Sequence, residues 1–395
     1  FSPAGPAVIR NRSRRRPARM RHDVIVVGLG IMGSAALATL AARGHKVLGI
    51  ERFDLGHAMG SSHGVNRIIR IAYFEGAAYV PMVQRAARLW QELGERLGER
   101  ILHVTGTLDL APDSHFLTRQ SRESCLINNL PFEELDAPEI MRRFPAFRIP
   151  QNYAGIFQPD GGFVASDRAL AGLQMLALAD GAEIRAREPM LGFDPLPGGG
   201  VRVRTAGGTF EADSLILATG GWIGTHIPAL ARLAVPERQV LGWFRPENPA
   251  AFQPGAFPTS ILWSEAGHFY QFPIWGAPGF KIGCHRHLNQ QGPAETMDRE
   301  VHAEDEALLR KGLAFAFPEA NGACLRLTAC HYTVTPDEHF ILDRLPGAPQ
   351  VIVASPCSGH GFKFGSVFGE VLADLATGRE PGFDLSMFSL SRFGL

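Results

Sequence analysis

Three glycines in the spacing Gly-x-Gly-x-x-Gly stand between an apolar run and a stretch rich in alanine and leucine. They are Gly28, Gly30 and Gly33, and the apolar run is residues 24–27. In a strand–turn–helix unit, the first glycine allows the tight turn and the second lets the backbone approach a pyrophosphate. The third lets the helix pack closely on the strand, and the helix N-terminus attracts phosphates. The spacing predicts a dinucleotide site, against the alternative of a glycine turn in an ordinary α/β unit.

An acidic residue follows the next apolar run at the distance that such a site requires. Glu51 ends the expected strand 46–50 and is placed to accept hydrogen bonds from ribose hydroxyls. A later buried strand, residues 213–218, ends in small residues near Gly220. Such a strand end can lie against a bound dinucleotide, although a plain core strand with a glycine turn has the same pattern.

Three basic residues occur inside apolar stretches. Arg70 follows isoleucines, Lys281 lies between Phe280 and Ile282, and Lys363 lies between two phenylalanines. A lone Arg or Lys is normally a solvated surface charge. Apolar neighbours on both sides indicate instead a buried cation that is paired or functional.

The chain has 5 cysteines, an odd number at irregular spacings, with no Cys-x-x-Cys. This pattern argues against a disulfide framework or a zinc site and for a reducing, cytoplasmic compartment. Taken alone, Cys330 has the features of a small buried apolar residue beside a β-forming run.

Length and charge bound the class of protein. At 395 residues, about two domains are expected. Lys plus Arg (39) equals Asp plus Glu (39), which predicts neither a nucleic-acid nor a membrane partner. The sequence contains no apolar run of about 18 residues, so no membrane-spanning helix is expected. The Arg-rich residues 1–19 are expected to be a disordered basic extension, either upstream sequence before a natural start at Met20 or a transit-like or nucleic-acid-binding arm.

The pattern of apolar residues predicts a mixed α/β chain with two intertwined domains. Strands near residues 23, 47, 182, 213 and 351 are expected in a Rossmann-like domain, and the aromatic-rich residues 237–290 in an antiparallel sheet. Helices are expected at 79–97, 166–179 and 304–317, and a further one ending at 376. The first domain would comprise 20–105, 160–236 and 324–384. The insertions 106–159 and 237–323 would form a substrate domain, and 385–395 a tail.

Several longer motifs resemble one family in the same order along the chain. They are Gly60-Ser61-Ser62-His63-Gly64 with Arg67-Ile68-Ile69-Arg70, Phe280-Lys281-Ile282-Gly283-Cys284-His285, Ala329-Cys330-His331-Tyr332-Thr333 with Asp337-Glu338-His339-Phe340-Ile341, and Ser358-Gly359-His360-Gly361-Phe362-Lys363-Phe364. From about Arg21 onward the chain resembles the monomeric sarcosine oxidases and N-methyltryptophan oxidases, which are amine-oxidising flavoenzymes. Phe383-Asp384-Leu385 and Ser391-Arg392-Phe393 resemble the tryptophan-oxidising branch.

The resemblance implies FAD, bound through a covalent thioether from the flavin 8α-methyl group to Cys330. The residues expected to hold the cofactor are Gly28, Gly30, Ile31, Met32, Gly33, Glu51, Arg52, Ser61, His63, Arg67, Met190, Gly220, Trp222, Cys330, Gly359, His360, Gly361, Phe362 and Lys363.

The same resemblance assigns roles around the substrate. Arg70 and Lys363 match residues that hold the substrate carboxylate, and Lys281 matches a lysine that holds a water over the flavin ring and promotes reaction with oxygen. His63 and Arg67 match a pair beside the flavin ring. The polar wall of the substrate pocket is matched by Tyr270, Tyr332 and His285, although a lone strand histidine is often only a satisfied polar residue.

Two residues depart from the family pattern. Asn66 replaces a small hydroxyl residue before Arg67, and Phe74 replaces a glycine in the loop 73–76. A bulky Phe74 near the substrate entrance would change the pocket, which concerns the choice of substrate more than the chemistry.

The expected protein is a monomeric oxidase of N-methyl amino acids of the sarcosine or N-methyl-L-tryptophan type. It would use oxygen and release formaldehyde, the demethylated amino acid and hydrogen peroxide. Alternatives are an oxidase of cyclic or larger secondary amino acids, such as pipecolate-like ones, and a dehydrogenase that passes electrons to a non-oxygen acceptor. A flavin-binding subunit or sensor without turnover and a nicotinamide dehydrogenase are less favoured, and no metal is expected.

Overall fold

A parallel sheet forms the core of the first half of the molecule. The computed structural model describes residues 21–395, so the expected basic extension lies outside the described residues. Strand β1 (His22–Val27) pairs with β2 (Val47–Ile50) on one side and with β12 (Gly208–Leu217) on the other. The sheet continues through β9 (Glu183–Arg185) and β19 (Ala348–Ser355). The strands expected in the Rossmann-like domain therefore form one parallel array, which confirms the mixed α/β prediction.

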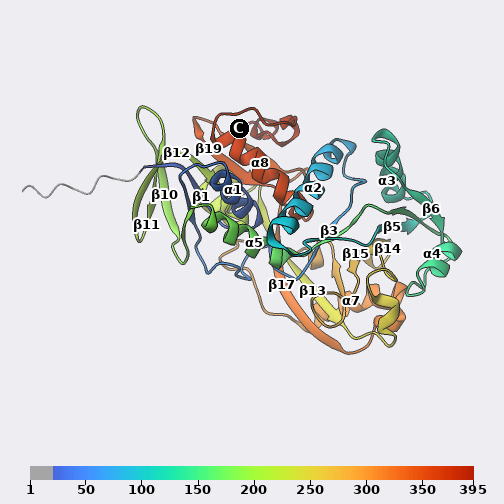
Figure 1. The fold of residues 1–395 in the computed structure, drawn as a ribbon. Helices are drawn as coiled ribbons and strands as arrows, with labels where there is room; N and C mark the ends of the chain where they lie inside the picture. Colours follow the sequence, from blue (N-terminus) through green and yellow to red (C-terminus); the bar gives the residue numbers. More distant parts are fainter. Residues whose placement is uncertain (1–20) are drawn as a thin grey trace, which may run out of the picture.

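Strand β12 is long enough to take two sets of neighbours. Its first half forms an antiparallel ribbon with β11 (Val201–Thr205) and β10 (Met190–Pro195), and β11 and β12 are joined by a tight hairpin turn. Its second half pairs with β19, which also pairs with β18 (Ile341–Leu345). In Figure 1 the ribbon projects from one end of the molecule.

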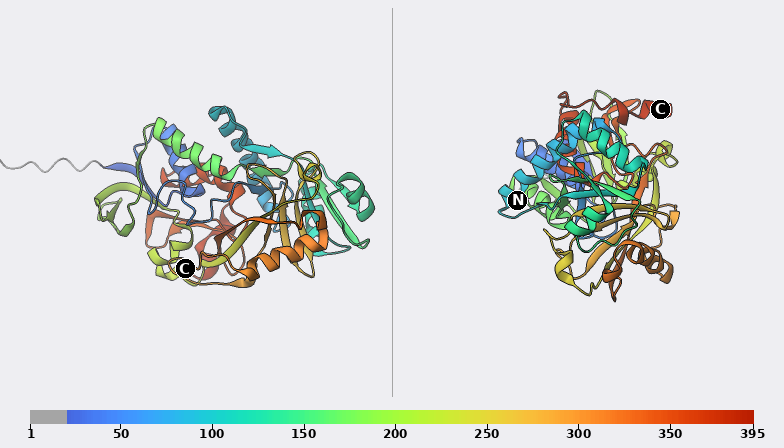
Figure 2. Two further views of the ribbon diagram at one scale, coloured as in Figure 1. Left: turned by 90° about the horizontal axis from the view of Figure 1, so that it is seen from below. Right: turned by 90° about the vertical axis from the view of Figure 1, so that its right-hand side faces the viewer.

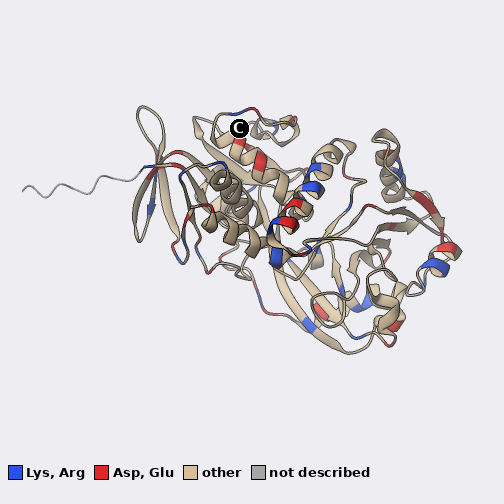
Figure 3. Ribbon diagram, in the orientation of Figure 1, with Lys and Arg blue, Asp and Glu red and all other residues tan. Residues whose placement is uncertain are grey.

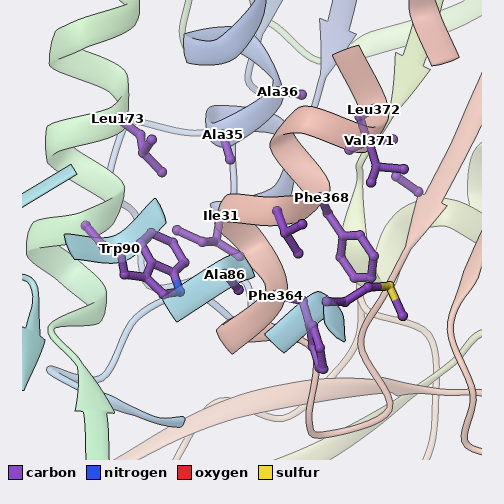
Figure 4. Close-up of a cluster of buried hydrophobic side chains, with 14 of the residues drawn as sticks. Ile31, Ala35, Ala36, Ala86, Trp90, Leu173, Phe364, Phe368, Val371 and Leu372 are labelled. Carbon is purple, nitrogen blue, oxygen red and sulfur yellow. The ribbon is translucent and has the colours of Figure 1, made fainter. Parts of the chain in front are cut away.

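Helices cover the parallel sheet and bury each other. They are α1 (Ile31–Ala42), α2 (Val80–Leu97), α5 (Ser166–Ala179) and α8 (Gly365–Ala376). Figure 4 shows Ile31, Trp90, Leu173 and Phe368 from these four helices gathered in one apolar cluster. Helices α1 and α8 pack closely because a Cβ on Gly369 would lie 2.8 Å from the Ala35 backbone.

A second, largely antiparallel sheet builds the other half, which lies beside the first in Figure 1 and in the left-hand view of Figure 2. Its order is β17, β13, β16, β15, β14, β5, β7, β6, and only β14 and β5 run parallel. The strands are β5 (Thr107–Pro112), β6 (Glu133–Asp136), β7 (Tyr153–Gln158), β13 (Val235–Phe244), β14 (Thr259–Ser264), β15 (Gly267–Phe272), β16 (Phe280–Cys284) and β17 (Cys324–Val334).

The strand that carries Cys330 joins this second sheet. The sequence boundary at residue 324 assigns β17 to the cofactor domain, yet β17 pairs along its length with β13. The chain thus passes from the second sheet to the first after residue 334. Cys330 and Tyr332 therefore belong to the second sheet.

Most of the remaining α-helices pack on the second sheet, and a small third sheet lies between the two halves. Helix α7 (Ala303–Ala316) packs on the second sheet, and α3 (Phe116–Ile127) and α4 (Ala137–Arg143) lie at its far end (Figure 1). A small sheet of β3 (Arg67–Ile69), β8 (Gly162–Val164) and β4 (Leu102–Val104) joins the two halves, and α6 (Ile223–His226) follows β12. Charges of both signs are interspersed along α2 (Figure 3). Among the described residues, no helix is long and apolar enough to span a membrane.

Candidate cofactor and substrate site

The turn between β1 and α1 has the geometry that the three glycines predict. Gly28 has φ +90°, and a Cβ there would lie 2.5 Å from the Ala218 oxygen. A Cβ on Gly33 would lie 1.9 Å from the Gly28 oxygen. Gly28 therefore allows the turn, and Gly33 lets the helix approach the strand.

Glu51 is held at the end of β2 beside this turn. Its carboxylate accepts hydrogen bonds from Leu29 N at 2.7 Å and Phe53 N at 2.9 Å. Burial alone would raise its pKa, but hydrogen bonding from His57, Phe53 and Leu29 lowers the pKa of Glu51 below 4.5. The acid is thus ionised and fixed where a ribose hydroxyl could reach it.

The first cavity, about 350 Å³, opens over the β1–α1 turn. The predicted cofactor residues that line it are Gly28, Gly30, Ile31, Met32, Glu51, Arg52, Ser61, Met190, Gly220, Trp222 and Phe362. Gly33 is absent because it packs beneath the turn.

Unpartnered polar atoms also line this first cavity. The Thr219 hydroxyl, the Trp222 indole nitrogen and both ring nitrogens of His331 are buried without a hydrogen-bond partner among the described residues. Buried polar groups normally have partners. These atoms, together with the glycine turn, fit a bound dinucleotide.

A second cavity, about 560 Å³, adjoins the first, and both are lined by Ser61 and His331. The predicted residues that line it are Arg67, Arg70, Tyr270, His285, Cys330, Tyr332, Gly359, His360 and Lys363. Residues from the second sheet, from β3 and from the loop after β19 therefore meet around one space. His63, Lys281 and Gly361 line neither cavity.

Strand register brings the second sheet's site residues to one face. Tyr270 stands opposite Gly283, and Phe272 stands opposite Lys281. Alternate residues of a strand point to the same side, so Cys330 and Tyr332 of β17 also share a face. A Cβ on Gly283 would lie 2.4 Å from the Tyr270 hydroxyl, which shows that the Tyr270 ring lies directly over Gly283. The opposite face carries the apolar core under α7.

Arg70 is 2% exposed and is paired with Glu75. Its Nη2 donates to both carboxylate oxygens of Glu75, and its guanidinium lies 4.0 Å from the Phe74 ring centroid. Burial opposes the charge of Glu75, but the Arg70 charge lowers the pKa of Glu75 to about 2. The Nε atom of Arg70 has no partner among the described residues.

Lys363 is also 2% exposed and is the second cation at this cavity. Its Nζ donates to the backbone oxygen of His360 at 2.7 Å and to the Tyr73 hydroxyl at 3.3 Å. Burial and the nearby charge of Arg70 lower the pKa of Lys363 to about 7. The two cations together could bind a carboxylate, Arg70 as a planar fork and Lys363 as a point charge.

Lys281 is buried, and its ammonium donates three hydrogen bonds. Its Nζ donates to Gly64 O at 2.8 Å and to the backbone and side-chain oxygens of Asn66, each at 2.7 Å. Burial, with the charge of Arg67, lowers the pKa of Lys281 well below 10.5. Asn66, which departs from the family pattern, is thus a direct partner of this lysine.

The loop before β3 brings His63 and Arg67 together. Arg67 donates to the backbone oxygens of Ser61 and His63. Burial and the Arg67 charge lower the pKa of His63 to about 3, so this imidazole is neutral. Burial raises the pKa of the Cys330 thiol, while Arg67 and Lys281 act in the opposite direction.

The second cavity has an aromatic wall, of which the sequence indicated only Phe74. Phe74 lies 6.3 Å from His268, His268 lies 4.7 Å from Trp263, and Trp263 lies 5.0 Å from Phe116, measured between ring centroids. Trp263 and His268 are directly paired across β14 and β15. Trp263 is two positions from Ile261, and His268 is two positions from Tyr270, so the strand alternation could have placed all four on one face. Phe116 belongs to α3, and only the tertiary fold brings it to this cavity.

Comparisons with known proteins agree with this geometry. The family model described as "FAD dependent oxidoreductase" matches residues 23–375. The chain is 39% identical to monomeric sarcosine oxidase of Bacillus sp. (strain NS-129) over 94% of this chain and 97% of that protein. It is 37% identical to N-methyl-L-tryptophan oxidase of Salmonella typhi over 95% of this chain and 100% of that protein.

A solved structure shows the same fold. NikD, described as an unusual amino acid oxidase essential for nikkomycin biosynthesis, superposes with a TM-score of 0.81 at 26% identity. The match covers 93% of this chain and 97% of NikD. The chain belongs to the FAD-dependent oxidoreductase family, within the group that includes the monomeric sarcosine oxidases and N-methyl-L-tryptophan oxidases.

Proposed function

We propose that this protein is an FAD-dependent oxidase of N-methyl amino acids. The observation that carries the proposal is a cavity with two buried cations, Arg70 and Lys363, beside a cavity built for a dinucleotide. A cationic pair on a polar, aromatic-lined cavity suits a ligand with one carboxylate and a less polar remainder. The choice of N-methyl amino acids as substrates is supported by the relatives, which are named as oxidases of sarcosine and of N-methyl-L-tryptophan.

The chain's own residues would bind and desolvate the substrate. Arg70 and Lys363 would hold the carboxylate, and closure of the cavity would lower the pKa of the secondary amine so that it reacts uncharged. Bound FAD would supply the two-electron acceptor for oxidation of the N-methyl group and the route of those electrons to oxygen. With water, the products are formaldehyde, the demethylated amino acid and hydrogen peroxide.

A substrate carboxylate would have to compete with the Glu75 carboxylate for the Arg70 guanidinium. Glu75 holds one edge of the Arg70 guanidinium, while the Nε atom is unpartnered. A substrate carboxylate could occupy the free edge or displace Glu75. In either case the loop 73–76 is part of substrate recognition.

The aromatic wall favours a substrate with an apolar side chain. Beginning at Arg70, a row of neighbouring rings runs through Phe74, His268, Trp263 and Phe116. Aromatic side chains bury large apolar areas and pair with other rings. An N-methyl aromatic amino acid would use this wall, whereas sarcosine has no side chain to place there.

Cys330 is the proposed attachment point of the cofactor. It lies on β17, its side chain borders the second cavity, and it is 5% exposed. The test is acid precipitation of the wild type and Cys330→Ser, followed by absorbance of the pellet. Flavin retained only by the wild type is the expected result, and flavin retained by both would place the linkage elsewhere. Cys284→Ser is a matched control, because Cys284 is equally buried but lies on the opposite, core face of the same sheet.

Oxygen as the electron acceptor, a monomeric state and a cytoplasmic location complete the proposal. Lys281, held by Gly64 and Asn66, supplies a fixed cation behind the site that would stabilise the developing charge on oxygen. Stoichiometric hydrogen peroxide from turnover is expected. Turnover with an artificial acceptor but without peroxide would favour a dehydrogenase instead.

A further inference from the structure

Tyr73 stands between the two cations of the proposed carboxylate site. Its ring centroid lies 4.5 Å from the Arg70 guanidinium carbon and 5.1 Å from Lys363 Nζ. Its hydroxyl oxygen is 3.3 Å from Lys363 Nζ. Tyr73 is 0% exposed and does not line the cavity, so it acts on the site through the lining residues that it contacts, which are Arg70, Lys363 and His360.

His360 fixes the direction of the Tyr73 hydroxyl. The Nε2 atom of His360 is 2.9 Å from the Glu338 backbone oxygen, which can only accept, so Nε2 carries the hydrogen. Burial, together with the charge of Lys363, lowers the pKa of His360 to about 3, so Nδ1 has a free lone pair. Tyr73 therefore donates to Nδ1 at 2.6 Å, and its own lone pairs are left to accept from Lys363.

Two buried cations at one cavity repel each other unless something between them compensates. The negative face of an aromatic ring attracts cations, and a phenol oxygen accepts from an ammonium. Tyr73 offers the ring to Arg70 and the oxygen to Lys363. We propose that Tyr73, oriented by His360, is the positioning residue that keeps Lys363 charged and aimed at the substrate carboxylate. This inference rests on the function proposed above.

Arg70, Glu75 and Asp109 are the other charged groups that act on Lys363. Arg70 stays charged and lowers the pKa of Lys363, while Glu75 and Asp109 raise it. Glu75 has its pKa lowered to about 2 by Arg70 against the effect of burial. Burial raises the pKa of Asp109 above 3.8, and Asp109 accepts a hydrogen bond from Ser121 at 2.6 Å. A pH midpoint of carboxylate binding that moves when Tyr73 loses its hydroxyl therefore reports Lys363, because that hydroxyl contacts the Lys363 ammonium.

The test compares Tyr73→Phe with Tyr79→Phe in the flavin-loaded protein. Tyr79 is a matched control because it is also 0% exposed and its ring lies 4.9 Å from that of Tyr73. Its hydroxyl bonds to His339 Nδ1 at 2.9 Å rather than to Lys363. The probe is (methylthio)acetate, a carboxylate without an amine, and its Kd is measured from flavin absorbance across neutral pH.

Tyr73→Phe is expected to weaken binding about tenfold, the usual effect of losing one hydrogen bond to a charged group. It is also expected to move the alkaline loss of binding to lower pH, because the ammonium has lost an acceptor. Tyr79→Phe should leave both quantities unchanged, whatever it does to the unfolding temperature. Equal Kd values and equal pH midpoints for the two variants would overturn the inference. A wild type that does not bind (methylthio)acetate at any pH would overturn the proposed carboxylate site and this inference with it.

Discussion

At the scale of single residues, burial decides which charges matter here. The apolar neighbours of Arg70, Lys281 and Lys363 predict burial, and each side chain is only 2% exposed. The hydrogen-bond and ion-pair partners of these cations could not be predicted from apolar neighbours. Glu75 follows Arg70 by five positions in an irregular loop, so its ion pair depends on the loop conformation rather than on a regular spacing.

Carboxylate binding should weaken as the pH rises through about 7. Burial and the Arg70 charge lower the pKa of Lys363 to about 7, so Lys363 is charged below this pH and neutral above it. The Kd of (methylthio)acetate is therefore expected to rise above neutral pH, with a proton taken up on binding. Calorimetry in buffers of different ionisation enthalpy measures that proton, and a Kd that is constant across neutral pH would refute the assignment.

The same pKa shift affects stability with a defined sign. The unfolded chain keeps the ordinary lysine value of 10.5, so between about 7 and 10.5 it binds more protons than the folded chain. This one group therefore makes folding more favourable as the pH rises across that window.

Replacing Lys281 with Met should slow reoxidation much more than reduction. The ammonium is fixed by Gly64 and Asn66, so its charge is preorganised before oxygen arrives. A loss of about a hundredfold in the oxygen reaction is expected, as for other preorganised charges. Stopped-flow measurement of the two half-reactions separates the steps. Lys311→Met on the exposed side of α7 is the control, and an equal fall in both half-reactions would contradict this role.

At the scale of elements, helices were easier to predict than strands. The expected helices at 79–97, 166–179 and 304–317 correspond to α2, α5 and α7, whose apolar residues repeat with helical spacing. Strand β17 was harder because part of it is half-exposed and its partner β13 lies far away in sequence. Its pairing places Cys330 on the second sheet, whereas the sequence boundary at residue 324 assigned it to the first domain.

The register of β16 can be tested at Gly283. A Cβ there would lie 2.4 Å from the Tyr270 hydroxyl, so Gly283→Ala should push the Tyr270 ring into the cavity. Overpacking of this kind costs about 1–3 kcal/mol of stability. We expect a raised KM together with a lower unfolding temperature, measured by kinetics and calorimetry. Gly292→Ala is the control, since no atom lies within 4 Å of its added Cβ. Unchanged kinetics for Gly283→Ala would mean that Tyr270 does not border the substrate.

At the scale of the whole molecule, the site lies where two sheets meet. The first cavity lies at the carboxyl ends of the parallel strands, which is the expected position for a dinucleotide. One face of the second sheet lines the second cavity. The glycine turn made the first half predictable. The aromatic wall was not, because β14, β15, α3 and the loop 73–76 come together only through tertiary packing.

Bound FAD should stabilise the whole fold. A ligand that binds only the folded state adds about 2.7 kcal/mol at a concentration of one hundred times its Kd. Cys330→Ser, which cannot form the proposed thioether, should therefore unfold at a temperature that rises with added FAD. NAD at equal concentration is the matched control, and a shift with NAD instead of FAD would contradict the cofactor assignment.

The central claim is tested most directly by anaerobic bleaching of the flavin absorbance. N-Methyl-L-tryptophan and sarcosine are mixed separately with the flavin-loaded protein in the absence of oxygen. The account predicts bleaching, with N-methyl-L-tryptophan acting at lower concentration because its indole can use the wall of Phe74, Trp263 and Phe116. A flavin-loaded protein that neither compound bleaches would contradict the proposed oxidation of N-methyl amino acids.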